Sequence, residues 1–279
     1  MLRNYLAAAL RNLARNKLYA SISIAGLAAG LCAAIIISLA LRNQFTFDRF
    51  IPGYERIYLA VSVLSPPGQA PLYQEWTHTS LGARLKQGFA AVEATTRLAQ
   101  EDAELQRGDI RAKESLYWAD PNVFEVLRLP VAFGDLNAAL RRPDGIVLTR
   151  SMARKYFGRD NAVGASLRVK REHPMTVTAV IEDLPVNGTQ LDSGIFASGL
   201  ASWSELTRLE SDPKNALSGD ALWINVRTYL RLAPNASIEH LRKAMPPLVD
   251  SMWPRRPPGL GASLELVRLD RVHTFKGLD

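Results

Sequence analysis

The stretch from Leu18 to Leu41 contains no charged residue and is almost entirely apolar, and it constrains this chain more than any other feature. About two dozen residues in an α-helix are long enough to cross the hydrocarbon core of a bilayer. We therefore predict a transmembrane helix at residues 18–41. Its length favours an uncleaved anchor over a signal peptide, whose apolar region is about 7–15 residues long. Ser38 and Ala40, a small-x-small pair, keep cleavage open as the alternative interpretation.

Small residues recur within this stretch, and residues of this type let two helices approach closely in lipid. A lone anchor with incidental glycines is the other interpretation. The single cysteine, Cys32, excludes an intramolecular disulfide and a Cys-rich zinc site. Leu31 precedes it where a lipid-attachment motif requires a small residue, so we interpret Cys32 as a packing or lipid-facing residue. The small residues are Gly26, Ala28, Ala29, Gly30, Ala33 and Ala34.

Basic residues are concentrated before this stretch. The chain has 34 Lys and Arg against 27 Asp and Glu, a net charge of +7 that on its own suggests nucleic-acid binding. Residues 1–42 contain five of the basic residues and no acidic residue, which leaves the remainder of the chain at only +2. Nucleic acid is therefore not expected as a partner. The positive-inside rule places the N-terminus in the cytoplasm and the residues from 43 onward outside.

Residues 1–17 predict a basic amphipathic helix that lies on the cytoplasmic leaflet. Leucines recur at helical spacing and arginines lie on the opposing side, where they are near anionic lipids. The plainer interpretation is a topology signal only. The leucines are Leu2, Leu6, Leu10 and Leu13, and the arginines are Arg3, Arg11 and Arg15.

Residues 42–279 mix helical and strand patterns without the regular alternation of a doubly wound sheet, so we predict an α+β domain with two lobes. Its first residues include Phe45, Phe47 and Phe50, which suit a membrane interface. The polar stretch 185–220 is weakly periodic and is predicted to be an excursion or a crossing between lobes. Helices are expected at 80–89, 122–127, 150–157 and 238–252, and strands at 57–64, 92–99, 110–118, 145–149, 166–170, 175–181 and 222–232.

No pattern for catalysis or metal binding emerges, and we predict no catalytic, cofactor-binding or metal-binding residue. The chain lacks a GxSxG elbow and a Walker A sequence, so any ATP dependence must come from a partner. The acid pairs Glu101–Asp102 and Glu182–Asp183 are interpreted as solvated loop charges. The histidines have no metal-ligand spacing, so surface or capping roles are expected for them. They are His78, His173, His240 and His273.

Several ordered blocks resemble a known family. In order, the chain carries NYLAAALRNLARNKLYASISIAGLAAGLCAAIIISL, FDRFIPGYERIY, ADPNVFEVLRLPVAFGDLNAAL, GIVLTRSMARKYFG with AVGASL, and MTVTAVIEDLPVN. These blocks resemble bacterial ABC-transporter permeases of the MacB and FtsX type and their MacB-like periplasmic core domain, over essentially the whole chain. One departure is Gly188-Thr189-Gln190, where relatives commonly carry a Ser-His pair. The matching positions are Phe124, Gly134, Asp135, Ala139, Leu140, Ala153, Tyr156, Phe157, Gly158, Gly164, Val177 and Pro185.

Structural roles can be predicted for some of these positions without the family. Gly134 and Asp135 predict a turn after the strand PVAF, with Asp135 capping a helix at 136–140. In the helix at 150–157, Ala153, Tyr156 and Phe157 share one face, and Gly158 is predicted to end it.

The resemblance implies a permease with four transmembrane helices, in which the periplasmic domain lies between the first and second and ATP-driven movement is relayed to it. It implies an ABC ATPase subunit, a second permease copy, a periplasmic adaptor and the lipid bilayer as partners, and single-pass insertion in the bacterial inner membrane. After Leu41 no uncharged run approaches about 18 residues, so a truncated or split permease acting in efflux or envelope mechanotransmission is expected. The alternatives are a membrane-anchored interaction module without ATP coupling, and a tethered enzyme, which needs a pocket collecting His78, His173 and nearby acids.

Overall fold

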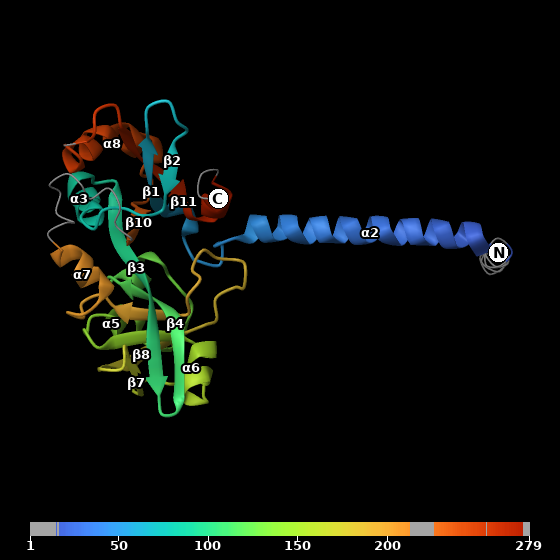
Figure 1. Ribbon diagram of the computed structural model, residues 1–279, viewed down its shortest axis with the longest axis horizontal. Coiled ribbons are helices and arrows are strands. Elements are labelled where there is room, and N and C mark those ends of the chain that lie inside the picture. The colour runs from blue at the N-terminus through green and yellow to red at the C-terminus, as the bar shows by residue number, and fades with distance from the viewer. Residues whose placement is uncertain (1–14, 16, 213–225, 255, 276–279) are drawn as a thin grey trace. The chain divides into compact units, whose positions relative to one another are not determined.

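The computed structural model describes residues 15, 17–212, 226–254 and 256–275, and it divides after Thr46 into two compact units. The predicted amphipathic segment at residues 1–17 therefore lies almost wholly outside the described residues. Residues 222–225 of the last predicted strand lie outside them as well. The two units are described separately below (Figure 1).

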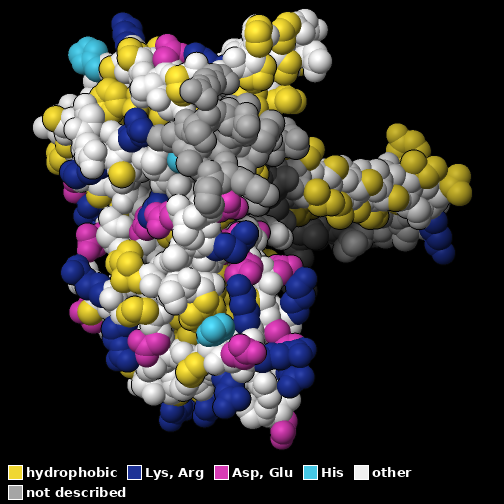
Figure 2. Space-filling model, turned by 60° about the vertical axis from the view of Figure 1, so that its left-hand side comes forward, with side chains coloured by type: hydrophobic (Ala, Val, Ile, Leu, Met, Phe, Trp, Pro, Cys, Tyr) yellow, Lys and Arg dark blue, Asp and Glu magenta, His cyan; other side chains and the backbone are white. Residues whose placement is uncertain are grey.

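The first unit is a single described helix, α2 (Lys17–Thr46). Its part from Lys17 to Ser38 is long and apolar enough to cross a membrane. Hydrophobic side chains are exposed along it, including Cys32, as expected of a surface that faces lipid (Figure 2). The helix continues eight residues past Ser38, which adds about 12 Å of length at the α-helical rise. An apolar N-terminal helix is thereby confirmed.

The second unit is built on one mixed sheet, which has eleven strands among the described residues in the order β11-β1-β10-β3-β4-β9-β6-β8-β5, with β2 paired to β1 and β7 paired to β3 and β8. Most neighbours are antiparallel, but β9 is parallel to β4 and β8 is parallel to β6. The mixed α+β domain is confirmed. The strands are β1 (Ile57–Ser65), β2 (Leu72–Gln74), β3 (Val92–Arg107), β4 (Ile110–Ala119), β5 (Val131–Gly134), β6 (Gly145–Thr149), β7 (Ser166–Val169), β8 (His173–Ile181), β9 (Ile195–Ser198), β10 (Val226–Leu232) and β11 (Gly261–Arg268).

The two ends of this sheet pack against different helices, but residues 47–279 form one compact unit, so the division into two lobes stays a prediction (Figure 1). At one end α3 packs on β3 and β10, and α8 packs on β11; at the other end α6 packs on β6 and β8. Strand β3 belongs to both ends, because it pairs with β10 at residues 92–99 and with β4 at residues 98–107. The helices of the domain are α3 (Leu81–Gly88), α4 (Val123–Val126), α5 (Leu136–Ala139), α6 (Arg150–Phe157), α7 (Glu205–Ser211) and α8 (Ile238–Met252), with 3-10 helices η1 (Tyr54–Arg56) and η3 (Leu269–Thr274).

The roles predicted for Asp135 and Gly158 are confirmed, and the structure adds Thr149 as the N-cap of α6. Asp135 accepts a hydrogen bond from the Asn137 amide at 2.9 Å and begins α5. Thr149 accepts from the Met152 amide at the start of α6, and Gly158 ends that helix in the left-handed region at φ +67°. These local signals lie within a few residues of their partners, which is why the sequence alone could identify them.

For the stretch 185–220, of which residues 213–220 lie outside the described part, the prediction of an excursion is wrong, and its alternative, a crossing between lobes, stays a prediction. This stretch contains β9, which is fully buried between β4 and β6, and the helix α7. Four residues of strand are too short to give a periodic signal. The predicted end of β3 at Ala99 is also wrong, because the strand continues through polar residues to Arg107. Strand β11 was not predicted at all.

Candidate functional site

The four histidines do not form a common site. His78 is 6% exposed, so a surface position is wrong for it, and its Nδ1 accepts a hydrogen bond from the Ser80 amide at 3.1 Å in a local turn. His173 and His273 each stack on an aromatic ring at 3.9 Å, and His240 is exposed on α8. No group of three His, Cys, Asp or Glu able to hold a metal ion occurs in the part of the chain that the structure describes.

The interpretation as loop charges is wrong for Glu101–Asp102, which lie within β3, whereas Glu182–Asp183 do lie in the loop after β8. Glu101 lies within β3 and accepts a hydrogen bond from the Trp118 indole N–H at 2.7 Å, while Lys170 lies 2.7 Å from it. Asp183 accepts a hydrogen bond from the Ser151 amide at the first turn of α6, and Glu182 pairs with Arg150. These carboxylates stabilise the sheet and the end of α6.

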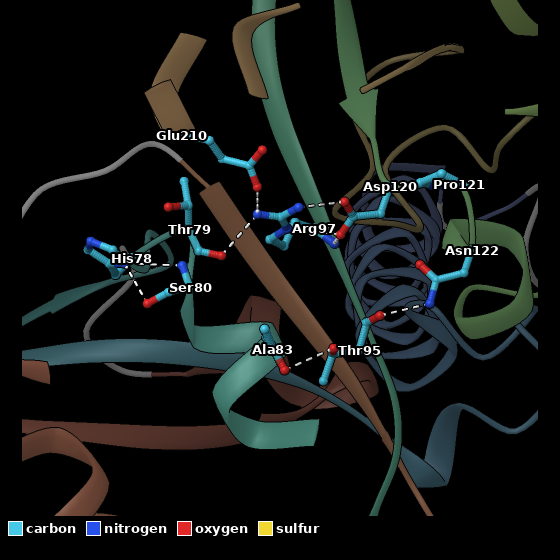
Figure 3. Close-up of a pocket in the computed structure, with 11 residues that line it drawn as sticks. His78, Thr79, Ser80, Ala83, Thr95, Arg97, Asp120, Pro121, Asn122 and Glu210 are labelled. Atoms are coloured by element: carbon cyan, nitrogen blue, oxygen red, sulfur yellow. Dashed lines mark hydrogen bonds and ion pairs between the residues drawn. The ribbon is translucent and has the colours of Figure 1, made fainter. Parts of the chain in front are cut away.

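A pocket of about 750 Å³ is lined by residues from α3, α7 and the adjoining ends of β3 and β4 (Figure 3). Arg97 lines this pocket. Its Nε and Nη2 donate hydrogen bonds to the Asp120 carboxylate at 3.0 and 2.8 Å. Its Nη1 donates to the Thr79 carbonyl and to Glu210. Burial lowers the pKa of Arg97, but the hydrogen bonds and charges of the two carboxylates outweigh it and raise the pKa above its usual value. Arg97 therefore joins the elements around the pocket. His78 lines this pocket and His173 does not, so the grouping that an enzyme site would need is not formed there.

A tighter arrangement lies where the domain begins, two residues after the end of α2. Asp48 is fully buried, and its amide donates to the Gly188 carbonyl at 2.9 Å. Its carboxylate accepts a hydrogen bond from the Thr189 hydroxyl. The backbone of Asp48 is left-handed at φ +53°, a conformation that Asp and Asn tolerate better than most residues. We call Asp48, Gly188 and Thr189 the exit clamp.

Burial gives this carboxyl unusual electrostatics. It raises the pKa of Asp48 to about 6, while hydrogen bonds from Thr189 and Gln190 work against the increase and the Asp270 carboxylate adds to it. Asp270 itself is held by Arg268 at 2.7 Å and by Arg49 at 3.5 Å. The first residues of the domain are thus fastened both to the 188–190 loop and to the C-terminal η3 helix.

A second group of hydrogen bonds joins the loop that contains Gly188 and Thr189 to the sheet. Two residues after Gln190, Asp192 accepts from the Tyr117 hydroxyl and donates its amide to the same oxygen at 3.1 Å. Arg227 on β10 also donates to the Tyr117 hydroxyl, at 3.2 Å, and pairs with Glu75 at 2.6 Å. We call Asp192, Tyr117 and Arg227 the polar relay. It joins the clamp loop to β4 and β10, strands on opposite sides of β3.

Replacing Tyr117 by Phe should lower the free energy of unfolding by about 1–3 kcal/mol, because Arg227 and the Asp192 amide then lose a buried acceptor. Urea unfolding of the full chain in detergent measures this. Tryptophan fluorescence reports the domain alone, since all five tryptophans follow residue 46. Tyr73→Phe is the matched control, and an equal loss in both variants would contradict a structural role for the relay.

Sequence reasoning singled out Gly188-Thr189-Gln190 only as a departure from the resembled pattern. The structure assigns these residues a definite place, since Gly188 and Thr189 bind the backbone and side chain of Asp48. The residues are 140 positions apart in the chain, so no local signal could have joined them. The one available hint was Asp48 itself, an acidic residue between two phenylalanines.

A family model and several solved structures are similar to this chain. The family model of the MacB-like periplasmic core domain matches residues 20–248. No curated protein matches the sequence. A domain of a protein described as a permease from Porphyromonas gingivalis has a similar structure, with a TM-score of 0.59 and 20% identity over 78% of this chain and 91% of that one. The periplasmic region of MacB from Actinobacillus actinomycetemcomitans aligns with a TM-score of 0.52 and 14% identity, over 81% and 94%. At these identities the likeness is one of fold.

Proposed function

The chain belongs to the family of the MacB-like periplasmic core domain, and on that premise we propose that it is the first membrane helix and periplasmic domain of a MacB-type ABC permease. In this proposal an ATPase subunit hydrolyses ATP in the cytoplasm. The resulting displacement of α2 moves the periplasmic domain in export or envelope mechanotransmission. The chain itself performs no catalysis.

The exit clamp is the observation that carries this proposal. A displacement of a helix reaches a following domain only if the first residues of the domain are held firmly to its core. Asp48 is held by one backbone hydrogen bond and one buried side-chain hydrogen bond, and Phe47 before it stacks on His273. The polar relay extends this attachment to β4 and β10, so a pull at Asp48 acts on the whole sheet.

The proposal places residues 1–17 in the cytoplasm, α2 across the inner membrane and the domain in the periplasm. The excess of basic residues before α2 supports this orientation. Its partners are an ABC ATPase, further permease helices or a second permease copy, and a periplasmic adaptor. Basic and acidic side chains are interspersed on the face of the domain in Figure 2, which suits protein partners rather than a polyanion.

Co-purification tests the partnership. The tagged full chain is extracted from its native host in detergent, and the proteins that remain bound are identified by mass spectrometry. Recovery of an ABC ATPase supports the proposal. Recovery of envelope proteins without an ATPase contradicts it and favours the anchored interaction module.

Breaking the clamp should uncouple ATP hydrolysis from domain movement. We expect Thr189→Val to leave hydrolysis by the partner intact while abolishing the ATP-dependent change in distance between spin labels on two copies, because Val cannot donate to Asp48. The label is attached at exposed Gln87 after Gln87→Cys in a Cys32→Ser background, since Cys32 is the single cysteine.

Thr178→Val is the matched control for this experiment. Its hydroxyl donates to the Ile146 carbonyl at 3.2 Å, away from the clamp. The distance change should persist in this variant. Equal distance changes in both variants would exclude the clamp as the coupling element.

A further inference from the structure

We propose that Asp48 is a proton-controlled latch: its neutral carboxyl holds the exit clamp closed, and its ionised form loosens it. The group lies at a mechanically sensitive point, because it is the second residue after α2 and its own amide and side chain make the clamp bonds. Its left-handed backbone is retained only while those bonds hold it.

The hydrogen-bond geometry favours a neutral carboxyl. Oδ1 accepts from Thr189, but Oδ2 is buried without a hydrogen-bond partner among the described residues. The side-chain amide of the neighbouring Gln190 acts on this carboxyl, and its oxygen and nitrogen atoms are also buried. A protonated Asp48 gains an O–H that can donate to the Gln190 carbonyl oxygen, whereas an ionised one leaves a charge in the core without a cation.

Charged and titratable groups act on Asp48 from the elements that pack around it. From η3, the Asp270 carboxylate is the charge that acts on Asp48, and Arg268 and Arg49 pair with Asp270. From β10, the buried Tyr229 hydroxyl interacts with Asp48. His273 stacks on Phe47 and is the other group near the clamp with an ordinary pKa close to neutrality. No ion pair to Asp48 forms among the described residues, so only the hydrogen bonds from Thr189 and Gln190 offset the burial of its charge.

The direction of the pH effect follows from these groups. The pKa of Asp48 in the folded domain, about 6, lies above its usual value of 3.8. The folded state therefore binds the proton more tightly than an open state does, and this contribution to stability is complete below about pH 4 and is lost as the pH rises through about 6. Acid conditions tighten the clamp and neutral conditions loosen it.

The use of this latch in regulation rests on the proposed coupling function, but the latch itself can be tested without an ATPase. Hydrogen–deuterium exchange of the full chain in detergent is measured between pH 5 and 7.5 and corrected for intrinsic exchange rates. For peptides covering residues 47–56 and 185–194, we expect protection to fall by about 10-fold between pH 5 and 7.5, because a pKa of about 6 in the folded state against 3.8 in an open state gives about that ratio at pH 5 and almost none at pH 7.5.

Variants separate Asp48 from its neighbours. Asp48→Asn keeps a carbonyl oxygen for Thr189 and cannot ionise, so its protection should stay at the acid level of the wild type at every pH. His273→Phe keeps a ring against Phe47 and should retain the wild-type pH dependence. A flat wild-type profile, or loss of the dependence in His273→Phe alone, would overturn the latch and leave the coupling proposal intact.

Thr189→Val provides a second measurement if Asp48→Asn does not fold. The Thr189 hydroxyl lowers the pKa of Asp48, so its removal should move the midpoint of the pH dependence upward. An unchanged midpoint would mean that another group titrates.

Discussion

Arg97→Met should lower the free energy of unfolding of the domain by about 3–5 kcal/mol, because it leaves the part-buried carboxylate of Asp120 without its cation. The same substitution removes the bonds to the Thr79 carbonyl and to Glu210, so α7 and the segment before α3 lose their common attachment. Urea unfolding of the full chain in detergent, followed by tryptophan fluorescence, gives this value.

Arg159→Met is the matched control, since Arg159 is exposed and makes no side-chain hydrogen bond or ion pair among the described residues. Its expected effect is within about 0.5 kcal/mol. Similar losses in the two variants would mean that Arg97 contributes only as an ordinary surface residue. The stability of the region around the pocket would then come from apolar packing.

Gly134→Ala is expected to be the second severe substitution, with a loss of about 3 kcal/mol or more from strain and a steric clash. Gly134 has φ +88°, and a Cβ there would lie 2.6 Å from the Thr178 carbonyl oxygen and 2.9 Å from the Ala179 Cα. These are backbone atoms of β8, so the β5–β8 pairing has to shift to admit the methyl group. Thermal unfolding of the same full chain measures the loss.

Gly158→Ala separates the two causes. Gly158 also has a positive φ, +67°, but a Cβ there would meet no atom within 4 Å. This variant should lose only about 1 kcal/mol, the cost of the backbone conformation alone. If Gly134→Ala and Gly158→Ala lost the same free energy of unfolding, the close approach of β5 to β8 would not be a cause of the loss at Gly134.

Prediction from sequence succeeded where the determining interactions are local. The α6 helix has its cap at Thr149 and its stop at Gly158, so its bounds of 150–157 follow from neighbouring residues. The apolar stretch before residue 42 predicted the apolar N-terminal helix for the same reason. The resemblance to MacB-like domains added the fold, because it uses the order of several blocks at once.

Prediction failed where distant parts of the chain decide the outcome. Strand β9 is a strand because β4 and β6 lie on either side of it, and its four residues have no pattern of their own. Glu101 lies inside a strand because Trp118 and Lys170 compensate its carboxylate. The clamp joins Asp48 to Thr189, which lie 141 positions apart in the sequence, so neither residue indicated the other.

The shared strand β3 affects how the protein unfolds and is degraded in the cell. Because β3 is one continuous strand that pairs with β10 along one part of its length and with β4 along the other, each end of the sheet helps to order the strand that the other end uses. Unfolding should be cooperative, and a partly working half-domain should not accumulate. A damaged copy would then be exposed as a whole to proteases, so quality control would remove entire chains instead of leaving partly folded ones.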